Sequence, residues 1–284
     1  MRSVLGVDRT FNLSSLFLTL TVYKNKSVTR ARTNDAPLFI GPMMLHGDGQ
    51  YRTYLRFFSE LRGALNCDVG SPEVRTQDII TGSDEEKALV RAVRDGLHVA
   101  SHLFCSLHAK DNLRHHMTHY GVPQDVREKV ISLAFGTDGV STAADSAAFD
   151  ARVSTLMQYV RQSYSDIADY VSNRAIPKLR NNCELMWANA WLAHYAWNNN
   201  NCESVNNLLK IRVDWKPARV SDLVDHLQDL VQLQHRDVRR ALSGQGNYQL
   251  APALSRHYVP FSRWTSMTES ARDTAFAAFM ADNG

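Results

Sequence analysis

The order of strand-like and helix-like segments in residues 3–121 constrains the fold most. Short β-branched runs and 3.6-residue apolar stripes alternate there in the order βββαβαβ. The first two strands are joined so closely that we expect them to be antiparallel, whereas the later strands are separated by helices and should be parallel. The segments are strands 3–11, 13–25, 37–45 and 77–84, helices 51–65 and 85–97, and a strand followed by a helix in 98–121. These features predict an α/β fold with a mixed sheet flanked by helices.

After Gly121 the strand patterns stop. We divide the chain into a first core part (1–121), an all-helical insertion (122–196) split by a polar loop, a short helical segment that completes the core (197–216) and a helical C-terminal extension (217–284).

Composition supports a globular protein. Hydrophobic residues make up 44% of the 284 residues, and 32 basic against 29 acidic residues give a net charge of +3. This small excess permits a polyanionic partner without demanding one. Four scattered cysteines favour a reducing compartment. No apolar stretch has the length of a membrane span and no signal peptide is visible, so we expect no membrane association. Strand-like sequence directly after Met1 suggests that the chain was excised from a longer one.

Two aspartates end strand-like segments, Asp8 in the first and Asp84 in the fourth. The ends of neighbouring parallel strands are where open α/β sheets build their sites. Two carboxylates placed together there favour a hard cation such as Mg²⁺ or Mn²⁺. A third carboxylate would complete a two-metal site for phosphoryl transfer.

The third carboxylate that we select is Glu203, in the stretch NNNNCESVNNLLK (198–210). Asparagine is a poor helix former, so its abundance at a helix start suggests either a polar helix cap or an active-site carboxylate, Glu203, that the polar helix start holds in place. We expect Asn199–Asn201 to cap the helix, and Asn206, Asn207 and Lys210 to contact the site or a phosphate backbone. Rival acids that spacing does not exclude are Asp48, Asp78, Asp111 and Glu184.

Four blocks in this order resemble the catalytic core of Mutator-like (MULE) transposases: VDRTFNLS (7–14), GSDEEKALVRAV (82–93), CSLHAKDN (105–112) and NNCESVNNLLK (200–210). Together they span roughly residues 3–215. The resemblance implies an RNase H-like fold with an all-helical insertion before the acidic helix. It also implies catalytic and metal-binding roles for Asp8, Asp84 and Glu203, two Mg²⁺ or Mn²⁺ ions, and DNA as substrate. The zinc-finger modules of the family have no counterpart in this sequence.

Cys105 and His108 form a Cys-x-x-His motif that supplies half of a zinc ligand set. We expect a buried cysteine with a hydrogen-bonded histidine that supports the site, and no zinc. The aromatic residues Trp187, Trp191, Tyr195 and Trp197 are most simply the core of the insertion, with base stacking as the alternative.

These patterns lead us to expect a DDE-type transposase that cleaves DNA phosphodiesters and transfers strands, acting as a homo-oligomer with transposon ends and target DNA. In a eukaryote it would be nuclear, and otherwise cytoplasmic. Two alternatives stay open: a domesticated, catalytically silent DNA-binding or scaffold protein, and an RNase H-like nuclease without strand transfer.

Overall fold

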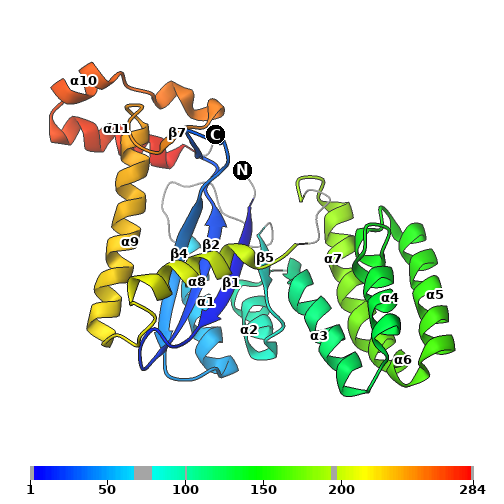
Figure 1. Ribbon diagram of the computed structural model, residues 1–284. Coiled ribbons are helices and arrows are strands. Elements are labelled where there is room, and N and C mark those ends of the chain that lie inside the picture. The colour runs from blue at the N-terminus through cyan, green and yellow to red at the C-terminus, as the bar shows by residue number, and fades with distance from the viewer. Residues whose placement is uncertain (1–2, 67–78, 100, 193–196, 283–284) are drawn as a thin grey trace.

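The computed structural model describes residues 3–66, 79–99, 101–192 and 197–282. Its centre is a five-stranded mixed sheet with the strand order β4-β2-β1-β5-β6 (Figure 1). Strand β2 is antiparallel to both β1 and β4, while β5 is parallel to both β1 and β6. The strands are β1 (Val4–Thr10), β2 (Phe17–Lys24), β4 (Leu38–His46), β5 (Ile80–Ser83) and β6 (Ser101–Phe104). The prediction of a mixed α/β sheet, antiparallel first and parallel later, is confirmed.

Helices cover both faces of this sheet. Helices α1 (Tyr51–Asn66) and α2 (Lys87–Leu97) pack on one face, where Tyr54, Phe58 and Leu97 are fully buried. Helix α8 (Asn200–Arg212) crosses the opposite face in front of β1 and β2 in Figure 1. The first half of α9 (Val220–Ala241) joins α8 in the apolar core on that face.

The helices that follow β6 form a separate bundle beside the sheet (Figure 1). Among the described residues from 122 to 192, all regular structure is helical. The apolar core of this bundle already begins within α3, at Leu113 and Met117. The elements are α3 (Ser106–His119), α4 (Gln124–Phe135), a 3-10 turn (Val140–Thr142), α5 (Ser146–Ser163), a second 3-10 turn (Ser165–Ile167), α6 (Ala168–Tyr170), a π-helical turn (Val171–Ala175) and α7 (Ile176–Ala188).

Two asparagines of α7 attach the bundle to the edge of the sheet. Asn182 accepts from the Phe104 backbone N–H (3.0 Å) and donates to the Phe104 carbonyl (2.7 Å), as a neighbouring strand would. Asn181 donates to the carbonyl of His102 (2.7 Å). The free edge of β6 is therefore satisfied by side chains, which protects it from pairing with another chain.

The C-terminal extension is not purely helical, so that prediction is corrected. Strand β7 (Tyr248–Leu250) pairs antiparallel with β3 (Val28–Arg30), which itself lies between β2 and β4 in sequence. Three residues are too few for an alternating pattern to be recognised, and the pairing is set by packing of Val28 and Phe39 against the extension. A 3-10 turn (Pro252–His257), α10 (Phe261–Ser266) and α11 (Glu269–Ala281) complete this part.

Among the described helices, none is long and apolar enough to cross a lipid bilayer.

Candidate active site

Strand register brings Asp8 and Asp84 side by side. In the parallel pair β1–β5, Gly6 lies opposite Gly82. Two residues farther along each strand direction, Asp8 lies in β1 and Asp84 directly follows β5. Neighbouring strands are about 4.8 Å apart, so the two carboxylates share one edge of the site.

Glycines in the same register let the opposite layer approach the sheet closely. A Cβ on Gly6 would lie 2.7 Å from Sγ of Cys202, and a Cβ on Gly82 would lie 2.4 Å from the ring of Trp197. Because side chains alternate along a strand, each glycine faces the same side as the aspartate two residues later. The repeated Gly-x-Asp pattern therefore leaves room for Cys202 of α8 and for Trp197 against the sheet, and it places Asp8 and Asp84 next to this contact.

Glu203 enters this site from the first turn of α8. Its carboxylate makes no hydrogen bond or ion pair within the described part of the chain, and its negative charge raises the pKa of Asp84. The structure thus brings together three acids that lie far apart in sequence. All three lie near the buried thiol of Cys202, because burial and then the charges of Asp8, Asp84 and Glu203 raise its pKa.

Two asparagines of α8 and its cap hold the aspartates. Asn206 Nδ2 donates to Oδ2 of Asp8 (2.6 Å), and the Arg9 backbone N–H donates to Oδ1 of the same carboxylate (2.9 Å). Asn199 Nδ2 donates to Oδ1 of Asp84 (3.2 Å). Asn199 is the N-cap residue, but its side chain makes no capping bond, contrary to our expectation, because it is used for Asp84 instead.

The surroundings of Asp8 and Asp84 disfavour the ionised form of both carboxyl groups. Burial, and then the charge of Asp84, raise the pKa of Asp8 to about 7, although the bonds from Arg9 and Asn206 oppose the shift. Burial also raises the pKa of Asp84, opposed mainly by His108. A nearby divalent cation would restore both carboxylates to the charged form.

Cys105 and His108 adjoin Asp84. Nδ1 of His108 lies 3.2 Å from Sγ of the buried Cys105 and 3.0 Å from Oδ1 of Asp84. Sγ also accepts from the Asn199 backbone N–H (3.3 Å). Burial raises the pKa of this thiol, which favours the protonated form rather than a metal-binding thiolate.

Two sets of side chains offer ligands for a cation, but only one of them already has its ligand atoms close together. Within the described residues, Asp84, Cys105 and His108 are the one group of three whose ligand atoms all lie within 4.8 Å of one another. The carboxylate oxygens of Asp8, Asp84 and Glu203 do not all lie within this distance of one another, but oxygen ligands alone suit Mg²⁺ or Mn²⁺ better than a soft metal. Binding through these carboxylates needs no deprotonation of the Cys105 thiol, so Asp8, Asp84 and Glu203 are the better chemical match for hard cations.

Several expected residues lie elsewhere. Asn207 is exposed and its side chain makes no hydrogen bond among the described residues, because it lies one position from Asn206 and therefore on another face of the helix. Lys210 contacts aromatic rings rather than the acids. Asp48 accepts from Gln50 and Thr53 at the start of α1.

Two further rival acids, Asp111 and Glu184, are also separate from the site. Asp111 pairs with Arg114, and Glu184 pairs with Arg180. Asp78 lies outside the described residues, as does Tyr195.

The tryptophans do not form one cluster. Trp187 packs in the helical core and donates to the Ala143 carbonyl (2.8 Å), as expected. Trp197 packs against Gly82 of the sheet instead, which corrects its assignment to the insertion core. Lys26 lies over the Trp191 ring, 5.4 Å from its centroid.

Sequence reasoning missed three supporting residues, of which Asn199 is one. The others are Arg9 and Glu86, whose ion pair (3.3 Å) links the residue after Asp8 to the start of α2. Tyr54 donates to the other carboxylate oxygen of Glu86 (2.9 Å). The signal for this link was present in the sequence, since an arginine follows one site aspartate and two glutamates follow the other.

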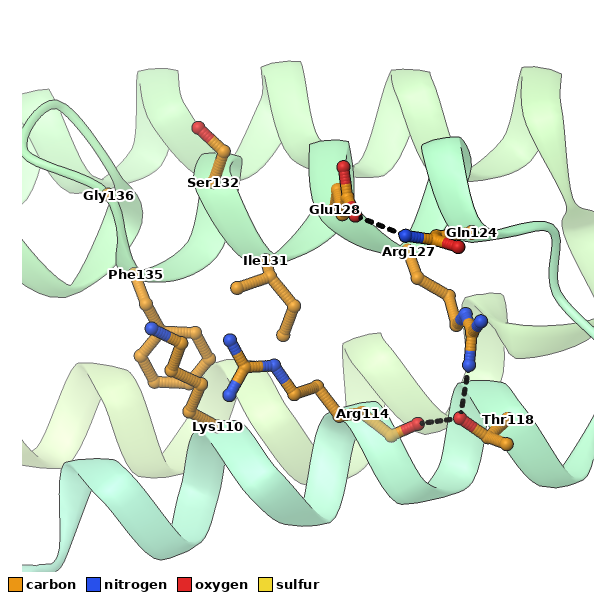
Figure 2. A pocket seen from close by; sticks show the side chains of 10 residues that line it. All are labelled: Lys110, Arg114, Thr118, Gln124, Arg127, Glu128, Ile131, Ser132, Phe135 and Gly136. Atoms are coloured by element: carbon orange, nitrogen blue, oxygen red, sulfur yellow. Dashed lines mark hydrogen bonds between the residues drawn. The ribbon is translucent and has the colours of Figure 1, made fainter.

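A basic groove of about 660 Å³ lies between α3 and α4. Figure 2 shows Lys110 and Arg114 of α3 beside Phe135 and Ile131 of α4. Arg127 donates to Thr118 (2.6 Å) across the groove. Helix α3 is the helix that begins beside Asp84, so the groove leads away from the candidate site.

Comparison with known protein families found no family model that matches the chain, and comparison with curated proteins found no significant match.

Proposed function

We propose that the chain is the catalytic domain of a DDE-type transposase, which cleaves DNA phosphodiesters and transfers strands with the aid of two divalent cations. The observation that carries the proposal is that Asp8 and Asp84 lie on adjacent parallel strands and that the charge of Glu203, from a helix more than a hundred residues later, raises the pKa of Asp84. Three acids from distant segments, two of them with raised pKa values, are typical of a metal-dependent phosphoryl-transfer site.

The fold supports this proposal. Three antiparallel strands followed by two parallel strands that helices connect are the arrangement expected of an RNase H-like sheet. The helical bundle lies between β6 and the helix that carries Glu203, where the Mutator-like resemblance expects an insertion.

Each residue has a chemical task in the proposed site. Asp8, Asp84 and Glu203 would hold Mg²⁺ or Mn²⁺, and the cations would neutralise phosphate charge and activate water or a DNA 3′-hydroxyl. Asn206 and Asn199 fix the orientations of the two aspartates. His108, through its contact with Asp84, favours the charged form of that carboxylate.

DNA suits the charge distribution. An acidic site repels phosphates until cations neutralise it, whereas the basic groove between α3 and α4 attracts them. We propose assembly as a homo-oligomer on DNA, with a nuclear location in a eukaryote.

The test is nicking of a supercoiled plasmid by purified protein with Mg²⁺ or Mn²⁺, compared with Asp8→Asn, Asp84→Asn and Glu203→Gln. Each substitution removes a metal ligand, so we expect rates to fall about 100-fold or more. Glu184→Gln is the matched control, because Glu184 is an exposed acid on α7 that pairs with Arg180. This variant should nick DNA at the wild-type rate.

Equal nicking by wild type and all three site variants would overturn the assignment. Tight DNA binding with no nicking under any metal would instead favour the catalytically silent DNA-binding protein. Nicking without joining of a 3′-hydroxyl end to target DNA would favour the simple nuclease.

A further inference from the structure

Two large aromatic side chains are exposed beside the candidate site. Trp215 is 64% exposed and Phe11 is 53% exposed, although both rings are largely apolar. Phe11 follows the end of β1, three residues after Asp8, and Trp215 follows the end of α8. We call Phe11, Trp215 and Lys210 the aromatic patch.

Backbone hydrogen bonds close the turn that carries Trp215. Its N–H donates to the carbonyl of Lys210 (2.8 Å), and the N–H of Asp214 donates to that of Ile211 (3.1 Å). Asp214 and Trp215 have φ values of 51° and 58°. This left-handed conformation is unusual for a bulky side chain, and it directs the chain so that the indole remains outside the core.

Lys210 lies between the two rings. Its Nζ is 5.9 Å from the centroid of Phe11 and 5.9 Å from that of Trp215, within reach of a cation–π attraction. Lys210 makes no ion pair with an acid in the described residues. Its charge is therefore free to attract an anion that approaches the rings.

The aromatic patch is continuous with the candidate site. Asn206, which binds Asp8, precedes Lys210 by four residues on the same helix. Residues at this spacing lie on one face, about 6 Å apart along the helix axis. A nucleotide bound at the patch would thus lie one helical turn from Asp8.

We propose that the aromatic patch stacks an unpaired nucleobase of the bound nucleic acid, with Lys210 contacting the adjoining phosphate. Bases in a duplex have their faces covered, whereas an unpaired base offers a flat π-face to aromatic side chains. The combination of two exposed rings with a cation that no acid neutralises among the described residues fits this base-plus-phosphate unit. The inference rests on the proposed function for the presence of nucleic acid at the site.

The test measures metal-free binding of a short single-stranded oligonucleotide and of a blunt duplex of the same length, by anisotropy of a label on the nucleic acid. We expect Trp215→Ala to weaken single-strand binding about 5- to 150-fold, the range for loss of one base–aromatic stack. Duplex binding should change by less than about threefold. Trp215→Phe retains an aromatic face and should restore most of the affinity.

Phe261→Ala is the matched control, because Phe261 is 50% exposed on α10 and lies outside the patch. Unchanged single-strand binding by Trp215→Ala, or equal losses for single strand and duplex, would overturn the stacking role. Since no metal is used, the result is independent of nicking. Trp215-dependent binding by a protein that never nicks would sustain the patch and count against the transposase proposal.

Discussion

At the scale of single residues, the charge of Asp8 depends on its burial and on the charged groups next to it. Its pKa rises to about 7 because it is buried and because Asp84 is near. An unfolded aspartate has a pKa near 4, so between these values the folded protein binds a proton that the unfolded chain releases. The free energy of unfolding therefore falls as pH rises from about 4 to about 7, because the folded state must keep Asp8 protonated or carry its buried charge.

We predict that Asp8→Asn stabilises the metal-free protein at pH 8 but has little effect at pH 4. The full shift corresponds to an upper bound of about 4 kcal/mol. Urea unfolding at the two pH values measures the difference. Added Mg²⁺ should stabilise the wild type and do much less for the variant, because the cation binds the carboxylate of the folded state. A variant less stable than wild type at pH 8 would contradict the assigned electrostatics.

At this scale the sequence indicated which distant residues lie near one another better than it indicated their individual contacts. Strand ends pointed to Asp8 and Asp84, and a polar helix start pointed to Glu203. Asn206 and Asn207 were expected to act alike, yet one binds Asp8 and the other is exposed. A step of one residue turns a helix by about 100°, and the phase of α8 is set by its packing on Gly6, which a single sequence does not show.

At the scale of elements, the close approach of α8 and Trp197 to the sheet positions the site. We predict that Gly82→Ala lowers the free energy of unfolding by about 1–3 kcal/mol, because a Cβ there would lie 2.4 Å from the Trp197 ring. It should also weaken Mg²⁺-induced stabilisation, since the segment that leads into α8 must shift. Chemical denaturation with and without Mg²⁺ measures both effects.

Gly63→Ala is the control for this change. Gly63 lies in α1, and a Cβ added there would meet no other atom within 4 Å, so alanine should stabilise by about 0.5–1 kcal/mol. If Gly82→Ala were as stable as wild type, the glycine would not be needed for the close packing.

The groove between α3 and α4 gives a second prediction at this scale. Lys110 lines the groove without an ion-pair partner among the described residues, whereas Lys129 is exposed and does not line it. Lys110→Ala should reduce the slope of log affinity for duplex DNA against log salt by about one, while Lys129→Ala should leave it unchanged. Equal slopes for both variants would show that DNA does not follow the groove.

Elements were predictable where apolar periodicity was long enough to identify them. The three-residue strands β3 and β7 were not, because their pairing joins Arg30 to Tyr248 across most of the chain. Such contacts arise from tertiary packing rather than from local pattern. The attachment of α7 to β6 through Asn181 and Asn182 was hidden for the same reason.

At the scale of the whole molecule, the apolar interior is divided among separate clusters rather than one core. Phe149 is fully buried in the helical bundle, and Phe58 is fully buried between α1, α2 and the sheet. We predict that Phe149→Ala accelerates amide hydrogen exchange mainly in α4, α5 and α7, whereas Phe58→Ala accelerates it mainly in α1, α2 and β1. Each change removes the same ring and should cost about 3–5 kcal/mol within its own cluster, and parts with separate cores can open separately. Hydrogen exchange followed by mass spectrometry compares the two variants directly, each serving as the control for the other. The same increase across the entire chain in both variants would mean that the bundle and the sheet unfold as one cooperative unit.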